Sequence, residues 1–183
     1  GHIGDLGNYI FQTACAEMSK LYKDTNTKPR ISINVSPRQL TQAGLIPAIT
    51  SIINHFELTP ECITIEITEH VVIENFNSVK HKLYELQSLG LQISLDDFGT
   101  GYSSLSYLQQ LPLSELKIDR SFVMNLEANS NESNLVRTII EIGHEFGLTI
   151  VAEGVETLYQ LNYLKKLNCN HYQGCLLYTS PSP

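Results

Sequence analysis

The chain has 183 residues, of which 42% are hydrophobic, and this content suffices to bury the core of one domain. Its net charge is −7 and its lysines and arginines form no cluster, which argues against binding of a nucleic-acid polymer. No apolar run approaches the roughly 18 residues that span a bilayer, the chain opens without a signal peptide, and the four cysteines form no CxxC pair. The composition is typical of a single reduced, cytoplasmic domain.

The predicted elements alternate between helices and strands along the chain. A helix over residues 5–22 comes first, with Asp5 as its cap. The predicted strands cover residues 31–36, 62–68, 91–97, 114–119, 148–154 and 171–173, and further helices cover 45–56, 77–89, 105–110, 132–146 and 158–167. Gly90 and Gly147 follow two of these helices, as glycine commonly does at a helix end. Strand–helix repeats of roughly 20–35 residues predict parallel strands joined by crossover helices.

Two architectures have this order of elements, an open doubly wound sheet and a (β/α)8 barrel. The strands differ between their two faces: in residues 62–68 Ile63, Ile65 and Ile67 alternate with polar side chains, and strand 91–97 shows the same alternation. Strands of an open parallel sheet are usually apolar on both faces, because helices cover both. The alternation therefore favours a barrel whose inner face becomes polar towards its mouth.

Polar side chains stand near the carboxyl end of each predicted strand, where a barrel places its catalytic groups. They are Asn34, Glu66, Asp96 with Asp97, Lys117 with Asp119, Glu153 and Gln173. Each of them alone is compatible with a turn, a cap or a surface position, but their shared phase favours a common site. Converging carboxylates repel one another unless cations lie between them, and Mg²⁺ or Mn²⁺ prefers such oxygen ligands. Two metals about 3.5–4 Å apart suit displacement at a phosphate.

The segment DFGTGYSS, residues 97–104, is a second candidate feature. Its two glycines permit close approach and positive φ, and the free N–H groups of the helix that follows could face a phosphate. A plain connection between a strand and a helix remains the alternative for this segment.

Six motifs in this order resemble the EAL-domain cyclic di-GMP phosphodiesterases. They are INVSP (33–37), IEITE (65–69), LDDFGTGYSSL (95–105), LKIDRSFV (116–123), VAEGVET (151–157) and YQG (172–174). The resemblance implies an α/β fold, a modified (β/α)8 TIM-like barrel, that hydrolyses cyclic di-GMP to linear pGpG with two Mg²⁺ or Mn²⁺ ions.

The resemblance also implies roles for single residues. Asn34, Glu66 and Asp96 resemble ligands of the first metal, and Asp96, Asp97 and Glu153 ligands of the second. Lys117 resembles the group that orients or deprotonates the attacking water, with Asp119 supporting Lys117 or a metal-bound water. Glu69 resembles the anchor of the loop at 97–104, which also takes part in dimerisation in this family. The remaining residues expected in the loop or around substrate and water are Gly99, Thr100, Gly101, Ser103, Glu156 and Gln173.

The chain departs from the family pattern at both ends. The Glu-Ala-Leu motif, whose Glu is a metal ligand, does not occur in it, and CLLYTSPSP replaces the expected closing segment after Gly174. We therefore expect residues 1–174 to be a partial EAL domain, truncated at its N-terminus, and residues 175–183 to be an aberrant or truncated tail. A barrel without its first two strands has unpaired edges, so we expect the isolated chain to be poorly stable and inactive.

Three functions are compatible with these residues. The first is the phosphodiesterase, with cyclic di-GMP as its ligand, a homodimer formed through the EAL domain, and membrane contact only through possible upstream segments. The second is a non-catalytic cyclic di-GMP receptor or interaction module. The third, independent of the family, is a metal-dependent barrel lyase or isomerase, which adjacent aspartates before a glycine-rich loop suit less well.

Overall fold

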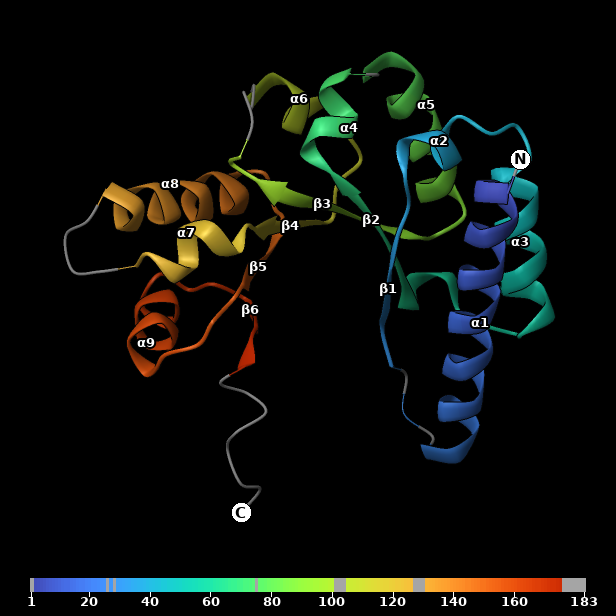
Figure 1. Ribbon diagram of the computed structural model, residues 1–183, viewed down its shortest axis with the longest axis horizontal. Helices are drawn as coiled ribbons and strands as arrows, with labels where there is room; N and C mark the ends of the chain where they lie inside the picture. The colour runs from blue at the N-terminus through green and yellow to red at the C-terminus, as the bar shows by residue number, and fades with distance from the viewer. Residues whose placement is uncertain are drawn as a thin grey trace. The chain divides into compact units, whose positions relative to one another are not determined.

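Six strands alternate with helices in the computed structural model, which describes residues 2–25, 27, 29–74, 76–100, 105–126 and 131–175 (Figure 1). The strands form one sheet in chain order, β1-β2-β3-β4-β5-β6. The pairs β1–β2, β4–β5 and β5–β6 are parallel, as the crossover helices predicted. The chain divides into two compact units, Gly1–Ser94 with Gln110–Pro112, and Leu95–Gln109 with Leu113–Pro183.

The elements that lie mainly in the first unit are α1 (His2–Thr25), β1 (Ile31–Asn34), α2 (Pro37–Leu40), α3 (Leu45–His55), the 3-10 helix η1 (Pro60–Cys62), β2 (Ile63–Thr68), α4 (Glu69–Glu74) and α5 (Phe76–Ser88). Strand β3 (Gln92–Phe98) passes from the first unit into the second. The remaining elements are α6 (Leu105–Gln110), β4 (Glu115–Ile118), α7 (Arg120–Met124), α8 (Asn131–Glu145), β5 (Thr149–Glu153), α9 (Leu158–Lys166) and β6 (His171–Gln173).

The first unit is built around β2, whose side chains from Ile63 to Ile67 are all buried. In Figure 1, α1 runs alongside α3, and Phe11 and Met18 of α1 are buried, as are Ile49 and Ile53 of α3. Burial of such side chains contributes about 1.5–3 kcal/mol each, which stabilises the helices on the sheet.

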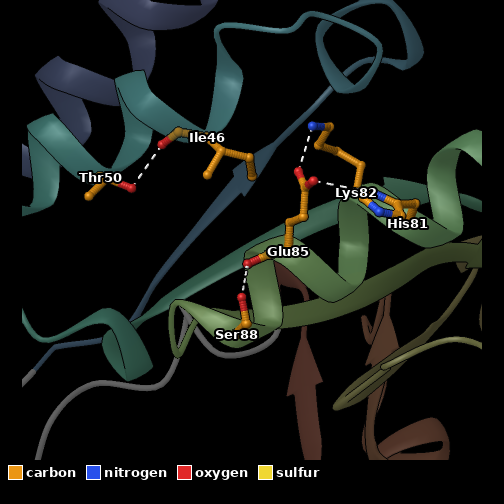
Figure 2. Close-up of polar contacts among 6 residues, drawn as sticks. All are labelled: Ile46, Thr50, His81, Lys82, Glu85 and Ser88. Atoms are coloured by element: carbon orange, nitrogen blue, oxygen red, sulfur yellow. Dashed lines mark hydrogen bonds and ion pairs between the residues drawn. The ribbon is translucent and has the colours of Figure 1, made fainter.

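Helix α5 presents an apolar face to the core and a charged face to solvent. Leu83 and Leu86 are fully buried, whereas Glu85 pairs with Lys82 at 2.6 Å and with His81 at 3.2 Å (Figure 2). The hydrogen bond from Lys82 lowers the pKa of the Glu85 carboxyl, and the charge on His81 acts in the same direction. Such partly exposed pairs between neighbouring helix residues stabilise a helix only slightly, so the buried face determines where α5 lies.

The second unit is built around β4 and β5, which pair in the register Lys117 with Val151. Leu116 and Ile118 are fully buried on one face of β4. Helix α8 packs against β5, and Ile140 of α8 and Ile150 of β5 are both buried. This buried core positions the carboxyl ends of β3, β4 and β5 at one edge of the unit.

The predicted strands and long helices are confirmed, with ends that shift by at most three residues. Helix α1 is longer than predicted and begins at His2, so Asp5 lies within its first turns and not at its cap. The short helices α2, α4 and α7 had not been predicted, because four to six residues show no apolar periodicity. In the described part of the chain, no helix has the length and apolar character needed to cross a bilayer.

Candidate active site

Lys117 lies between two carboxylates in the second unit. Its Nζ is 2.6 Å from Oε1 of Glu153 and 3.2 Å from Oδ1 of Asp96. Lys117 is only 6% exposed, although it was predicted as a residue of a polar strand face. Burial of an ammonium group is costly unless carboxylates neutralise it. The three side chains are therefore held together from three neighbouring strands, with Lys117 on the middle one.

The backbone turns sharply at the end of β3. Asp97 has a φ of +56°, a left-handed conformation that Asp tolerates better than most residues. Its N–H donates to Oδ1 of Asp96 at 3.0 Å, and the Thr100 hydroxyl donates to the Asp97 carbonyl at 2.8 Å. These bonds fix the turn that carries both aspartates.

The carboxyl groups of Asp97 and Asp119 act on one another. Burial raises the pKa of the Asp97 carboxyl, and the charges of Asp96, Asp119 and Glu153 raise it further. Burial alone would raise the pKa of Asp119, but hydrogen bonds from Ser121 outweigh it and hold that pKa below its usual value. Four carboxylates thus act on one another here, with the Lys117 ammonium between two of them.

Asp119 also begins α7. Its Oδ1 accepts hydrogen bonds from the N–H of Ser121 at 2.9 Å and from the Ser121 hydroxyl. Ser121 was not predicted as a site residue, although Asp119 at the end of a strand is a typical helix-start signal.

Two glycines position the backbone around Glu153. A Cβ on Gly154, whose φ is +71°, would lie 2.8 Å from Cβ of Arg120. A Cβ on Gly174 would lie 2.1 Å from the carbonyl oxygen of Val155, whose N–H donates to the Gln173 carbonyl at 3.1 Å. The chain after Glu153 therefore lies directly against α7 on one side and the end of β6 on the other.

Four more of the predicted residues lie in the second unit. Gln173 is the register partner of Glu153, and its side chain is exposed. Glu156 is also exposed, and its N–H donates to Oε1 of Gln160 at 2.8 Å, next to the start of α9. Gly99 and Thr100 follow β3 directly. Gly101 and Ser103 lie outside the described residues, so the expectation of phosphate binding by this loop stays a prediction.

The first unit holds the other three predicted residues. Asn34 and Glu66 are register partners at the ends of β1 and β2; Asn34 is exposed, whereas Glu66 is 7% exposed. Glu69 begins α4 and is buried. Both glutamates make polar or electrostatic interactions, as burial of a carboxylate requires.

The carboxylates at the strand ends of the second unit suit a hard divalent cation, because they are oxygen donors and carry negative charge. Asp96, Asp97, Asp119 and Glu153 offer only oxygen donors, and burial together with their mutual repulsion raises the pKa of Asp97. Their arrangement is not that of a formed metal site, because among the described residues no three His, Cys, Asp or Glu side chains are grouped to hold an ion.

Comparison with known proteins points to one family. The model of the EAL domain matches residues 1–180. The signaling protein YkoW of Bacillus subtilis is 38% identical over 183 residues, which are 100% of this chain and 23% of that protein. The bifunctional diguanylate cyclase/cyclic di-GMP phosphodiesterase MucR of Pseudomonas aeruginosa is 38% identical over 177 residues, 97% of this chain and 26% of that protein. The chain therefore spans about a quarter of the length of these relatives.

Solved structures agree with this similarity. The PaMucR phosphodiesterase in complex with c-di-GMP superposes with a TM-score of 0.91 at 38% identity, over 100% of this chain and 74% of that one. The EAL domain of Mycobacterium smegmatis DcpA gives 0.87 at 40% identity, over 97% and 80%. These likenesses confirm the predicted α/β class and the modified TIM-like barrel architecture.

Proposed function

The chain belongs to the EAL domain family, and we propose that the domain containing it hydrolyses cyclic di-GMP to linear pGpG. One observation carries the proposal: the buried Lys117 pairs with Asp96 and Glu153 at the strand ends, beside Asp97 and Asp119. A relative with this family's domain, MucR, is named as a cyclic di-GMP phosphodiesterase. Activity, substrate and partners of the whole protein all belong to this proposal.

The proposed cation ligands are oxygen donors at strand ends. They are Asn34 and Glu66 in the first unit, and Asp96, Asp97 and Glu153 in the second. Bound Mg²⁺ or Mn²⁺ ions would supply an activated water and neutralise the leaving oxygen of the phosphodiester. The excess of carboxylates over cationic groups around Asp97 supports this requirement for divalent cations.

The chain's own residues orient the attack. The Lys117 ammonium donates hydrogen bonds and stabilises the negative charge that develops on the phosphate. Glu153 and Asp96 hold Nζ in one position, which favours a water aligned with the bond to be broken. In the reaction the water oxygen bonds to phosphorus, the bond from phosphorus to the 3′-oxygen breaks, and a proton passes to that oxygen. The product is the linear dinucleotide with a 5′-phosphate.

Asp119 and the glycines support this arrangement. Hydrogen bonds from Ser121 hold the Asp119 carboxylate at the first turn of α7. Gly154 lets the chain turn directly after Glu153. The hydrogen bonds to Asp119 and the turn at Gly154 keep the carboxylates in place during the reaction, so Asp119 and Gly154 are positioning residues.

Glu153→Gln in the full-length protein tests the proposal. Gln can still accept a hydrogen bond from Lys117, but it loses the charge, so we expect production of pGpG to fall at least ~100-fold, a loss typical of such charged groups. The readout is chromatography of nucleotides at saturating Mg²⁺ or Mn²⁺. Glu145→Gln at the end of α8, an exposed position, is the matched control and should leave turnover unchanged.

Two outcomes contradict the proposal. Equal turnover by the wild type and Glu153→Gln would remove Glu153 from the site. Tight binding of cyclic di-GMP by the wild type without any hydrolysis would favour the non-catalytic receptor. Dimerisation through the domain, a cytoplasmic location and the inactivity of the 183-residue chain by itself stay predictions.

A further inference from the structure

Lys117 occupies a central position among the carboxylates at the strand ends. Strand β4 lies between β3 and β5 in the sheet, so Asp96 and Glu153 approach Lys117 from opposite sides. Nζ contacts both, at 3.2 and 2.6 Å, and the Lys117 side chain is 7% exposed. In this position the Lys117 ammonium neutralises the negative charge of two carboxylates that a divalent cation would also bind.

Asp119 has hydrogen-bond donors other than Lys117. Its Oδ1 accepts from the N–H and the hydroxyl of Ser121. The described residues contain no group of three carboxylates arranged around a vacant centre for a cation. In this structure Lys117 therefore lies at the centre of the carboxylates of the second unit.

We propose that Lys117 is an internal counter-ion that holds Asp96 and Glu153 together when no divalent cation is bound and competes with the cation for them. The inference rests on the proposed function in one respect, namely that these carboxylates bind the cation. It adds a second role for Lys117: its positive charge lowers the affinity of the site for divalent cations. Like charges a few ångströms apart repel appreciably at a partly buried site.

The direction of the effect separates this role from a merely structural one. Loss of a structural contact loosens a site and weakens cation binding. Loss of a competing charge strengthens cation binding, because Asp96 and Glu153 are then left without compensation. Lys117→Gln removes the charge, whereas Lys117→Arg keeps it.

The test is a titration of Mn²⁺ into the full-length protein after removal of metals with EDTA, followed by calorimetry and by the electron paramagnetic resonance of free Mn²⁺. We expect Lys117→Gln to bind Mn²⁺ about tenfold more tightly or better, and Lys117→Arg to stay within about threefold of the wild type, where tenfold equals about 1.4 kcal/mol. The control is Lys82→Gln, which removes a lysine from the ion pair with Glu85 on α5. It should leave Mn²⁺ affinity unchanged.

A second measurement covers the case in which Lys117→Gln does not fold without metal. The variant is then purified with Mn²⁺, and its affinity is obtained by competition with a fluorescent chelator. Equal or weaker binding by Lys117→Gln overturns the counter-ion role, while hydrolysis by the wild type would leave the proposed function standing. Absence of Mn²⁺ binding in both proteins overturns the counter-ion role and the proposed metal-dependent function together.

Discussion

Gly154→Ala should destabilise the domain through one defined clash. Gly154 follows Glu153 and has a φ of +71°. A methyl group there would lie 2.8 Å from Cβ and 3.4 Å from Cα of Arg120. Both atoms belong to the start of a helix and not to the flexible end of a side chain, so they can move only with α7.

Two terms set the size of the effect. The left-handed conformation costs a non-glycine residue about 1–2 kcal/mol, offset by about 0.4–1 kcal/mol because alanine has fewer unfolded conformations. Overpacking adds about 1–3 kcal/mol. We therefore expect Gly154→Ala to lower the free energy of unfolding by about 1–5 kcal/mol.

Gly147→Ala isolates the clash from the backbone term. Gly147 follows α8, has a φ of +70°, and no atom lies within 4 Å of an added Cβ. Gly147→Ala should lose only the free energy that the left-handed backbone conformation costs, without a clash. Gly154→Ala should therefore be the less stable of the two variants by about 1–3 kcal/mol. In a domain of this size the midpoints of thermal unfolding would differ by roughly 2–12 °C, measured by circular dichroism.

The clash also has a functional readout. Movement of the chain at Gly154 displaces the Glu153 carboxylate from Nζ of Lys117, so Gly154→Ala should lose pGpG production at a temperature where it remains folded. Gly147→Ala should retain it. Equal stability and equal turnover of the two variants would refute the reasoning.

Three further predictions concern single side chains. Burial and like charges raise the pKa of Asp97, so the folded protein binds the proton of this carboxyl more tightly than the unfolded chain does. Stability therefore falls as pH rises from the ordinary carboxyl pKa through the raised one. Asp97→Asn should raise the urea midpoint at pH 7, raise it less at pH 4, and abolish hydrolysis. Thr157→Ala should cost about 1 kcal/mol in urea unfolding, because its hydroxyl accepts the N–H of the first turn of α9; an unchanged midpoint would contradict the cap. Burial raises the pKa of the Cys15 and Cys169 thiols to about 11, so a thiol reagent at pH 8 should label exposed Cys175 first and these two only after unfolding.

The sequence predicted the regular part of the fold because its signals are local. Alternation of apolar and polar residues marked the strands, and Gly147 marked the end of a long helix. The short helices after the strands were missed because their signals are single capping residues. Ser36 before Pro37 and Asp119 before α7 are such signals, and each was assigned to a strand or a catalytic role instead.

The candidate site was predicted in outline but not in its contacts. Asp96, Lys117 and Glu153 stood out because each lies near the end of a strand. Lys117 follows Asp96 by 21 positions and precedes Glu153 by 36 positions in the sequence. The contact among the three depends on the order of the strands in the sheet, which no local pattern encodes. The close approach of Gly174 to Val155 depends on the same packing. The functional roles of these residues stay predictions.

The chain order of the sheet has a consequence for biosynthesis. Thr149 follows its register partner Glu115 by 34 residues, and His171 follows Val151 by 20. At a synthesis rate of about 5–20 residues per second, β5 leaves the ribosome about 2–7 s after β4. Each new strand of the second unit can therefore join the growing edge of the sheet as it emerges, and translation itself supplies the order of assembly.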